Sequence, residues 1–211
     1  MLPHQQHFNC FFPESITKLA YLSSYNIKIY KMNLYLRLFL VLINSIFSKK
    51  IGLFENSICK FRVLPNDADI NLHLNNGRYF SIMDLGRVDL AVRCGLFVVC
   101  IKHKWLPVIG SEMIRFIGEL KMLTTYEIRT NFIGCDQKWF YIRQDFYQKE
   151  KRMARAYVRG AFLDGKRKGL PEEILKALGL PLDDREKHSV AEEIKEYWNS
   201  VESKLLGDFS K

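Results

Sequence analysis

The clearest pattern along the chain is a helical spacing of apolar residues between Gly77 and Cys94. Apolar side chains at 79, 82, 83 and 90, with Gly86 between them, share one helix face because 3.6 residues make a turn. Gly95 stands where the end of a helix favours a left-handed residue. The pattern predicts one central helix of about four to five turns, directly after a strongly polar segment.

The segments before and after this helix have the composition and alternation of β-strands. Ser57–Val63 precedes it and ends at Pro65, which would stop a strand ladder. Four further strands follow, separated by turn residues, at 105–120, 125–133, 138–147 and 152–163. In the second of these, one side carries Tyr126, Ile128, Thr130 and Phe132. This order predicts an α+β fold, in which the long helix covers the apolar face of an antiparallel sheet.

The two ends of the chain differ from this central region, which we place at 57–165. Residues 1–31 show no sustained period, and we interpret them as a non-native or disordered extension before a natural start at Met32. Residues 32–56 contain an apolar run, Leu34–Phe47, which is shorter than the roughly twenty residues of a spanning helix. It predicts a helix that either packs on the domain or makes peripheral contact with a membrane surface. Residues 166–211 predict a tail with helices at 171–178 and 187–206.

Composition narrows the class of protein further. With 211 residues, 48% hydrophobic and 26% charged, the chain is long and apolar enough for one globular domain with a sizeable core. Its net charge of +9 favours anionic partners, but no aromatic-basic platform or recognition motif predicts nucleic-acid binding. The five cysteines lack the spacing of metal ligands, so we expect neither a metal site nor a cofactor. Unpaired thiols predict a cytoplasmic location.

The polar segment before the central helix holds the candidate chemistry: Asp67, Asp69, Asn71, His73, Asn75 and Asn76. The first N–H groups of a helix lack intrahelical partners and carry partial positive charge, so they can polarise a carbonyl group. A nearby carboxylate can attack that carbonyl or activate water, which suffices to hydrolyse a thioester. Purely structural roles remain open: Asn75 as a helix cap, Asp67 and Asn71 in turns, His73 in loop packing. The residues alone favour Asp69 only slightly over Asp67.

A family resemblance adds to these patterns. The series Asp67-x-Asp69-x-Asn71-x-His73-x-Asn75-Asn76-x-x-Tyr79, with Met83-Asp84-Leu85-Gly86-Arg87 and Arg93-Cys94-Gly95-Leu96 after it, resembles the signature of hotdog-fold acyl-CoA thioesterases. The type is that of 4-hydroxybenzoyl-CoA thioesterase, and the branch is that of thioesterase superfamily member six. The resemblance covers about residues 57–165. One position departs from it: Leu72 stands where such enzymes commonly have glycine.

The resemblance implies a fold, an activity and roles for particular residues. The fold is a hotdog fold, a curved antiparallel sheet wrapped around a long helix, in homodimers or tetramers whose active sites lie between subunits. The activity is hydrolysis of an acyl-CoA, with Asp69 as nucleophile or general base, the amide near Asn76 polarising the carbonyl, and His73 and Asn75 in the same catalytic site. Substrate contacts fall on Asn71, Arg78 and Tyr79. The alternative is a non-catalytic module that binds acyl-CoA or another partner on the same scaffold.

Overall fold

A computed structural model describes residues 34–165, 167–169, 171–180 and 192–207 of the chain. The chain divides into two compact units, Met1–Phe39 and Leu40–Lys211, and the second contains the whole sheet. The segment 1–31, which the sequence predicts to be an extension, lies outside the described residues. The predicted domain bounds at 31, 56 and 165 stay predictions.

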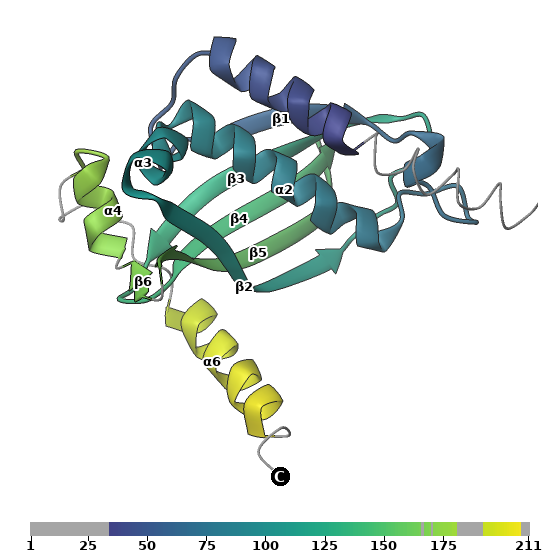
Figure 1. Ribbon diagram of the computed structural model, residues 1–211. Coiled ribbons are helices and arrows are strands. Elements are labelled where there is room, and N and C mark those ends of the chain that lie inside the picture. Colours follow the sequence, from purple (N-terminus) through teal and green to yellow (C-terminus); the bar gives the residue numbers. More distant parts are fainter. Residues whose placement is uncertain (1–33, 166, 170, 181–191, 208–211) are drawn as a thin grey trace, which may run out of the picture. The chain divides into compact units, whose positions relative to one another are not determined.

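The second unit is built on a six-stranded antiparallel sheet with the order β1-β3-β4-β5-β2, to which β6 adds beside β5 (Figure 1). The strands are β1 Ser57–Arg62, β2 Trp105–Phe116, β3 Thr125–Cys135, β4 Phe140–Gln148, β5 Lys151–Asp164 and β6 Arg167–Gly169. The five strands predicted from alternation are therefore confirmed, with ends shifted by a few residues. In β3 the predicted apolar side is the buried side, because alternate residues point to the same face.

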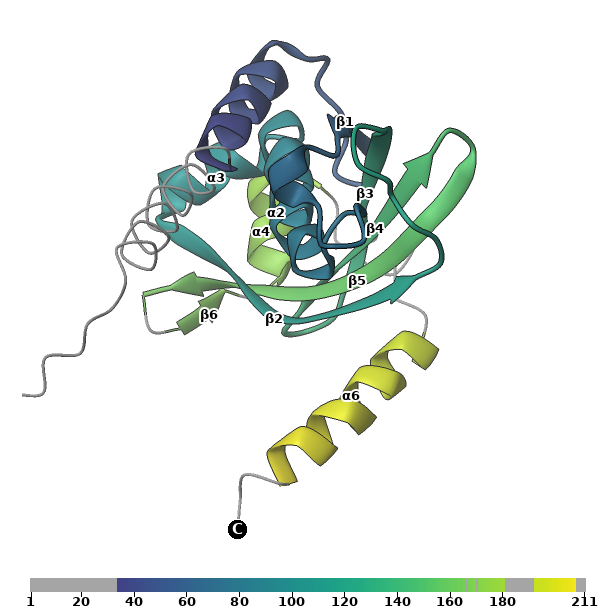
Figure 2. The same cartoon turned by 90° about the vertical axis from the view of Figure 1, so that its right-hand side faces the viewer.

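One long helix, α2 (Asn76–Arg93), lies against the concave side of this sheet, which curves around it (Figure 2). Its buried face includes Tyr79, Ile82, Met83 and Leu90, as the helical spacing predicts. Gly95 follows the helix with a φ of 84°, a left-handed conformation that costs glycine nothing. The α+β class, the central helix and its buried face are thus confirmed.

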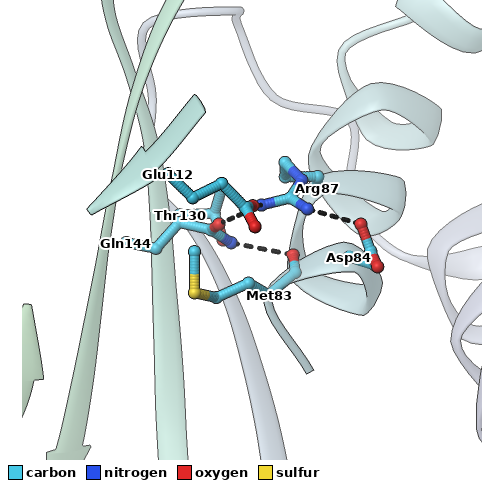
Figure 3. A network of polar contacts seen from close by, with 6 residues as sticks. All are labelled: Met83, Asp84, Arg87, Glu112, Thr130 and Gln144. Atoms are coloured by element: carbon cyan, nitrogen blue, oxygen red, sulfur yellow. Dashed lines mark hydrogen bonds and ion pairs between the residues drawn. The ribbon is translucent and has the colours of Figure 1, made fainter. Parts of the chain in front are cut away.

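A close approach at Gly86 fixes α2 against the middle of the sheet. A Cβ atom at this position would lie 2.6 Å from Thr130 Oγ1 and 3.1 Å from Gln144 Nε2. The buried Gln144 side chain donates from Nε2 to Met83 O at 2.9 Å and to Thr130 Oγ1 at 3.0 Å (Figure 3). Gln144 Oε1 also accepts a hydrogen bond from Arg87 Nη1 at 2.9 Å. These contacts hold the axis of α2, and therefore its N-terminus, in one position relative to β3 and β4.

Other helices complete the second unit. Helix α3 (Leu96–His103) was not predicted, because a run of apolar and β-branched residues shows no helical period. Helix α4 (Pro171–Ala177) confirms the helix predicted at 171–178, and Gly179 after it has a φ of 72°. Helix α6 (Glu192–Gly207) matches the described part of the helix predicted at 187–206.

The apolar run before the domain is helical over residues 34–47. Val41 and Ser45 of this helix are buried, and Ser45 Oγ donates a hydrogen bond to Asp89 Oδ1 of α2 at 2.6 Å. The half of the helix that belongs to the second unit therefore packs on the domain, one of the two predicted arrangements. Among the helices in the described part of the chain, none has the length and apolarity needed to cross a membrane.

Candidate active site

The polar segment forms a tight loop around the carboxylate of Asp69. Asp69 Oδ1 accepts hydrogen bonds from the backbone N–H of Asn71 at 2.9 Å and of His73 at 3.3 Å. The backbone N–H of Asp69 donates to His73 O at 2.9 Å, which closes the loop. Oδ2 of Asp69 makes no hydrogen bond to any residue that the structure describes, and the side chain is partly exposed. One carboxylate oxygen is thus fixed in place while the other is available to a ligand.

Asp67, the other candidate carboxylate, is buried and holds the loop through hydrogen bonds. Its side chain is only 3% exposed, and Oδ2 accepts from the Leu64 N–H at 3.0 Å. Oδ1 lies 3.9 Å from Arg78 Nε, and the backbone carbonyl accepts from the Asn75 N–H at 2.8 Å. A buried carboxylate with these partners is committed to holding the loop against α2. Burial therefore distinguishes the two acids, which spacing alone could not.

The loop leads directly into the N-terminus of α2. Asn75 is the N-cap, since its Oδ1 accepts from the Gly77 N–H at 2.9 Å, so the predicted cap is confirmed. The N–H of Asn76 makes no hydrogen bond within the part of the chain that is described. It is the kind of helix-terminal amide that can polarise a ligand oxygen.

The remaining predicted site residues have different surroundings. His73 Nε2 lies 3.1 Å from Glu119 Oε2. Arg78 donates from Nη2 to Asn66 O at 3.3 Å, and Asn71 is exposed beside Asp69. Tyr79 is 2% exposed between Phe116 and Phe146, and burial raises its pKa to about 12, so its hydroxyl stays neutral. The structure brings the backbone N–H groups of Asn71 and His73 to Asp69, whereas Asn75 at the N-terminus of α2 contacts Asp67. Tyr79 belongs to the core.

The segment 120–122, which the sequence did not indicate, forms backbone hydrogen bonds with the loop. The Leu74 N–H donates to Leu120 O and the Met122 N–H donates to Leu72 O, both at 2.8 Å. A bridge also joins His73 and Lys121. These contacts link residues nearly fifty positions apart in the sequence, so no local pattern could have revealed them.

Leu72 adopts a left-handed backbone with a φ of 61°, although it is not glycine. The loop therefore keeps the conformation that a glycine would favour, at a cost of roughly 1 kcal/mol for an L-residue with a Cβ atom. The Leu72 side chain is 58% exposed, so packing recovers little of this cost. Leucine therefore replaces the glycine of the family pattern at position 72, and the backbone there is left-handed.

Leu72→Gly should raise the free energy of unfolding by up to about 1 kcal/mol, because it removes the strain of the left-handed residue. Urea denaturation measures the change. Ile70→Gly, in the same loop but without a positive φ, is the matched control and should lower stability. Equal losses in both variants would show that Leu72 is not strained.

Fold and loop together define a hotdog-fold protein of the thioesterase type. The chain belongs to the Thioesterase-like superfamily, whose family model matches residues 63–178. The match includes the polar loop, α2 and the five strands β2 to β6, and it confirms the family resemblance drawn from the sequence.

Curated relatives agree with this assignment. Protein THEM6 of Danio rerio is 36% identical over 88 residues, which are 42% of this chain and 44% of that protein. Protein THEM6 of Xenopus laevis is 37% identical over 84 residues, 40% of this chain and 41% of that protein. Thioesterase poxG of Penicillium oxalicum is 23% identical over 185 residues, 70% of this chain and 61% of that protein. The chain thus spans less than half the length of the two THEM6 proteins that it matches.

Solved structures show the same fold at low sequence identity. The probable thioesterase YbaW from Escherichia coli superimposes with a TM-score of 0.53 at 19% identity, over 58% of this chain and 95% of that one. A variant of 4-hydroxybenzoyl-CoA thioesterase, complexed with 4-hydroxybenzoyl-CoA, gives a TM-score of 0.52 at 16% identity. The superposition covers 58% of this chain and 98% of that one. These likenesses establish the hotdog fold.

Proposed function

We propose that the protein hydrolyses an acyl-CoA thioester to a free acid and coenzyme A. The observation that carries the proposal is the position of Asp69 in the loop that leads into the N-terminus of α2. Asp69 has one oxygen fixed by two backbone N–H groups and one without a partner in the described chain. The same loop ends at the Asn76 N–H, which has no acceptor there either. The thioesterases among the relatives and the solved structures support this activity.

The chemistry follows from these two groups. The Asn76 N–H donates to the thioester oxygen, which becomes negative as the carbonyl carbon is attacked, and the helix dipole adds to this stabilisation. Asp69 Oδ2 either attacks the carbon directly or removes a proton from an attacking water. In the first route the carbon–sulfur bond breaks to leave an acyl-Asp69 anhydride, which water then hydrolyses. Both routes consume one water and release one thiol and one acid.

The other residues of the loop hold this arrangement. We assign Asn75 to the cap that exposes the Asn76 amide, and Asn71 and His73 to positioning Asp69 through their backbone N–H groups. The side chains of Asn71, Arg78 and Tyr79 stay predicted substrate contacts, with Asn71 exposed in the loop, Arg78 next to it and Tyr79 in the core. We place this catalytic domain at residues 57–165 and the helical tail at 166–211.

The alternative function is a hotdog module that binds acyl-CoA without hydrolysing it. Thiol release from short, medium, long and aromatic acyl-CoAs, measured together with acyl-CoA binding, separates the two functions. The proposal predicts catalytic release of thiol from at least one class of acyl-CoA. Saturable binding with no release across the panel would favour the binding module.

We propose that the active form is a homodimer or a tetramer in the cytoplasm. Two large apolar side chains of the site loop, Ile70 and Leu72, are exposed, as are Leu106 and Ile109 of the edge strand β2. A second copy of the chain would remove them from water. The four cysteines in the described residues carry free thiols, which fits a reducing compartment. Sedimentation velocity gives the subunit number, and a monomer at micromolar concentration would contradict the assembly.

We also propose that the helix at 34–47 contacts a membrane surface. Large apolar side chains are exposed along this helix at spacings of up to three residues: Tyr35, Leu36, Phe39, Leu40, Ile43, Ile46 and Phe47. The exposed Lys49 and Lys50 follow, and they favour an anionic surface. Cosedimentation with anionic vesicles tests the contact. Equal recovery of the parent protein and of Phe47→Ser with the vesicles would contradict it.

A further inference from the structure

Arginines gather on the face of the sheet that points away from α2. Ala154 and Ala156 of β5 pack in the core with α2, so Arg155 between them points to the opposite face. The strand register places Arg155 opposite Asp145 of β4 on one side and opposite Arg115 of β2 on the other. Since directly opposed residues share a face, these three side chains form one row across the outer face of the sheet.

Asp145 is a single buried carboxylate among three guanidinium groups. It is 5% exposed and accepts from Arg155 Nε at 2.6 Å and Nη2 at 3.1 Å. Arg143 Nε lies 3.3 Å from Oδ2, and Arg152 Nε lies 4.0 Å from Oδ1. The buried Nε atoms of Arg143 and Arg152 donate no hydrogen bond within the described chain. One carboxylate therefore neutralises only part of the local positive charge.

Beside this cluster runs a groove of about 860 Å³ between β2, β5 and α6, within the size range of ligand pockets. Arg115, Arg152 and Arg155 line it together with apolar side chains, among them Met113, Ile117, Tyr157, Ile194 and Tyr197. Helix α6 forms one wall and is anchored on the same sheet face. Trp198 packs on Tyr141, and Arg159 Nη2 lies 3.1 Å from Glu202 Oε2. The groove thus combines a cationic floor with apolar sides.

The charges in and under the groove leave a surplus that suits a particular anion. Four arginines (Arg115, Arg143, Arg152 and Arg155) face two carboxylates, Asp145 and Glu193. About two positive charges remain, and a phosphomonoester carries about −1.5 to −2 at neutral pH. Guanidinium groups also bind phosphate oxygens in pairs, which gives them an advantage over isolated lysines.

We propose that this groove binds a phosphomonoester attached to an apolar group. The phosphate lies against Arg115, Arg152 and Arg155, and the apolar part lies along Met113, Tyr157 and α6. The site is on the opposite face of the sheet from α2 and does not depend on the proposed hydrolysis. A free alkyl phosphate presents both parts of this ligand, whereas the 3′-phosphate of coenzyme A presents the phosphomonoester on a ribose, and binding measurements distinguish them.

Calorimetric titration of the full chain with decyl phosphate, below its micelle concentration, tests the site. Arg115→Gln and Arg152→Gln should each weaken binding about tenfold, because each removes a charged hydrogen-bond donor to the phosphate. Lys60→Gln removes the same charge from the exposed side chain of Lys60 on the far edge strand β1, and should leave the dissociation constant unchanged. Arg115 makes no ion pair with the described residues, so its variant should stay folded, as a thermal melt would verify.

Three further ligands test the proposal. Decanoate, with a single charge, should bind more weakly than decyl phosphate. Displacement of decyl phosphate by coenzyme A but not by dephospho-coenzyme A would identify the 3′-phosphate as the source, and failure of both to compete would identify an alkyl phosphate. Equal dissociation constants in all four proteins, or decanoate binding as tight as decyl phosphate binding, would overturn the proposal.

Discussion

Asp69→Asn should lower kcat for thioester hydrolysis by about a hundredfold to ten-thousandfold, the range lost with a general base or nucleophile. Asparagine has nearly the same shape, and its Oδ1 can still accept from the N–H groups of Asn71 and His73. The loop should therefore keep its conformation. What is lost is the negative oxygen that faces away from these two donors. The change should fall on kcat with little effect on acyl-CoA binding.

Asp84→Asn is the matched control for this variant. Asp84 lies on α2, its side chain is 67% exposed, and it forms an i,i+3 ion pair with Arg87. The same chemical change there should leave the rate within about twofold, since the Asp84 carboxylate is exposed and Arg87 keeps its contacts with Glu112 and Gln144. A rate for Asp69→Asn as high as that of Asp84→Asn would remove Asp69 from the mechanism.

Asp89→Ala should lower the free energy of unfolding by about 3 kcal/mol, the cost of breaking a buried charged pair. Asp89 is 5% exposed on α2 and accepts from Ser45 Oγ at 2.6 Å and from Ser57 Oγ. It also accepts from Arg93 Nη1 at 3.2 Å. The variant removes one acceptor shared by these three donors, in a place where water reaches them poorly. Urea denaturation measures the loss.

The control is again on the exposed side of α2. Asp84→Ala removes a carboxylate that is exposed to solvent, and should lower the free energy of unfolding by less than about 1 kcal/mol. Because Ser45 lies in the helix at 34–47 and Ser57 begins β1, the Asp89 variant should also expose this helix to proteolysis sooner than the control does. A loss of stability no greater than that of Asp84→Ala would show that Asp89 does not join these three elements.

The sequence predicted those parts of the fold that depend on local periodicity. The burial of alternate residues in β3 and of one face in α2 follows directly from spacings of two and 3.6 residues, so both were predictable. Helix α3 has no such signal, because its Leu96–Ile101 stretch is apolar on all sides. The register that places Arg115 opposite Arg155 depends on the pairing of β2 with β5, which are distant in the sequence, and no local pattern encodes it.

In the candidate site, too, only the features that depend on local sequence were predictable. Asn75 as a helix cap follows from its residue type and position, and the structure confirms it. The choice between Asp67 and Asp69 needs burial, because only the folded chain shows Asp67 enclosed beside Leu64 and Arg78. The left-handed conformation of Leu72 also needed the structure, since leucine gives no signal for it.

The most direct test of the central claim is a single-turnover reaction on the best acyl-CoA of the panel, with wild type and Asp69→Asn compared at saturating enzyme. Thiol and free acid are quantified together, and the dissociation constant of the same acyl-CoA is measured for both proteins. We predict equimolar thiol and acid from the wild type, and tight binding with release slowed at least a hundredfold in Asp69→Asn. Equal rates in the two proteins, or binding by the wild type without any release of thiol, would contradict the account.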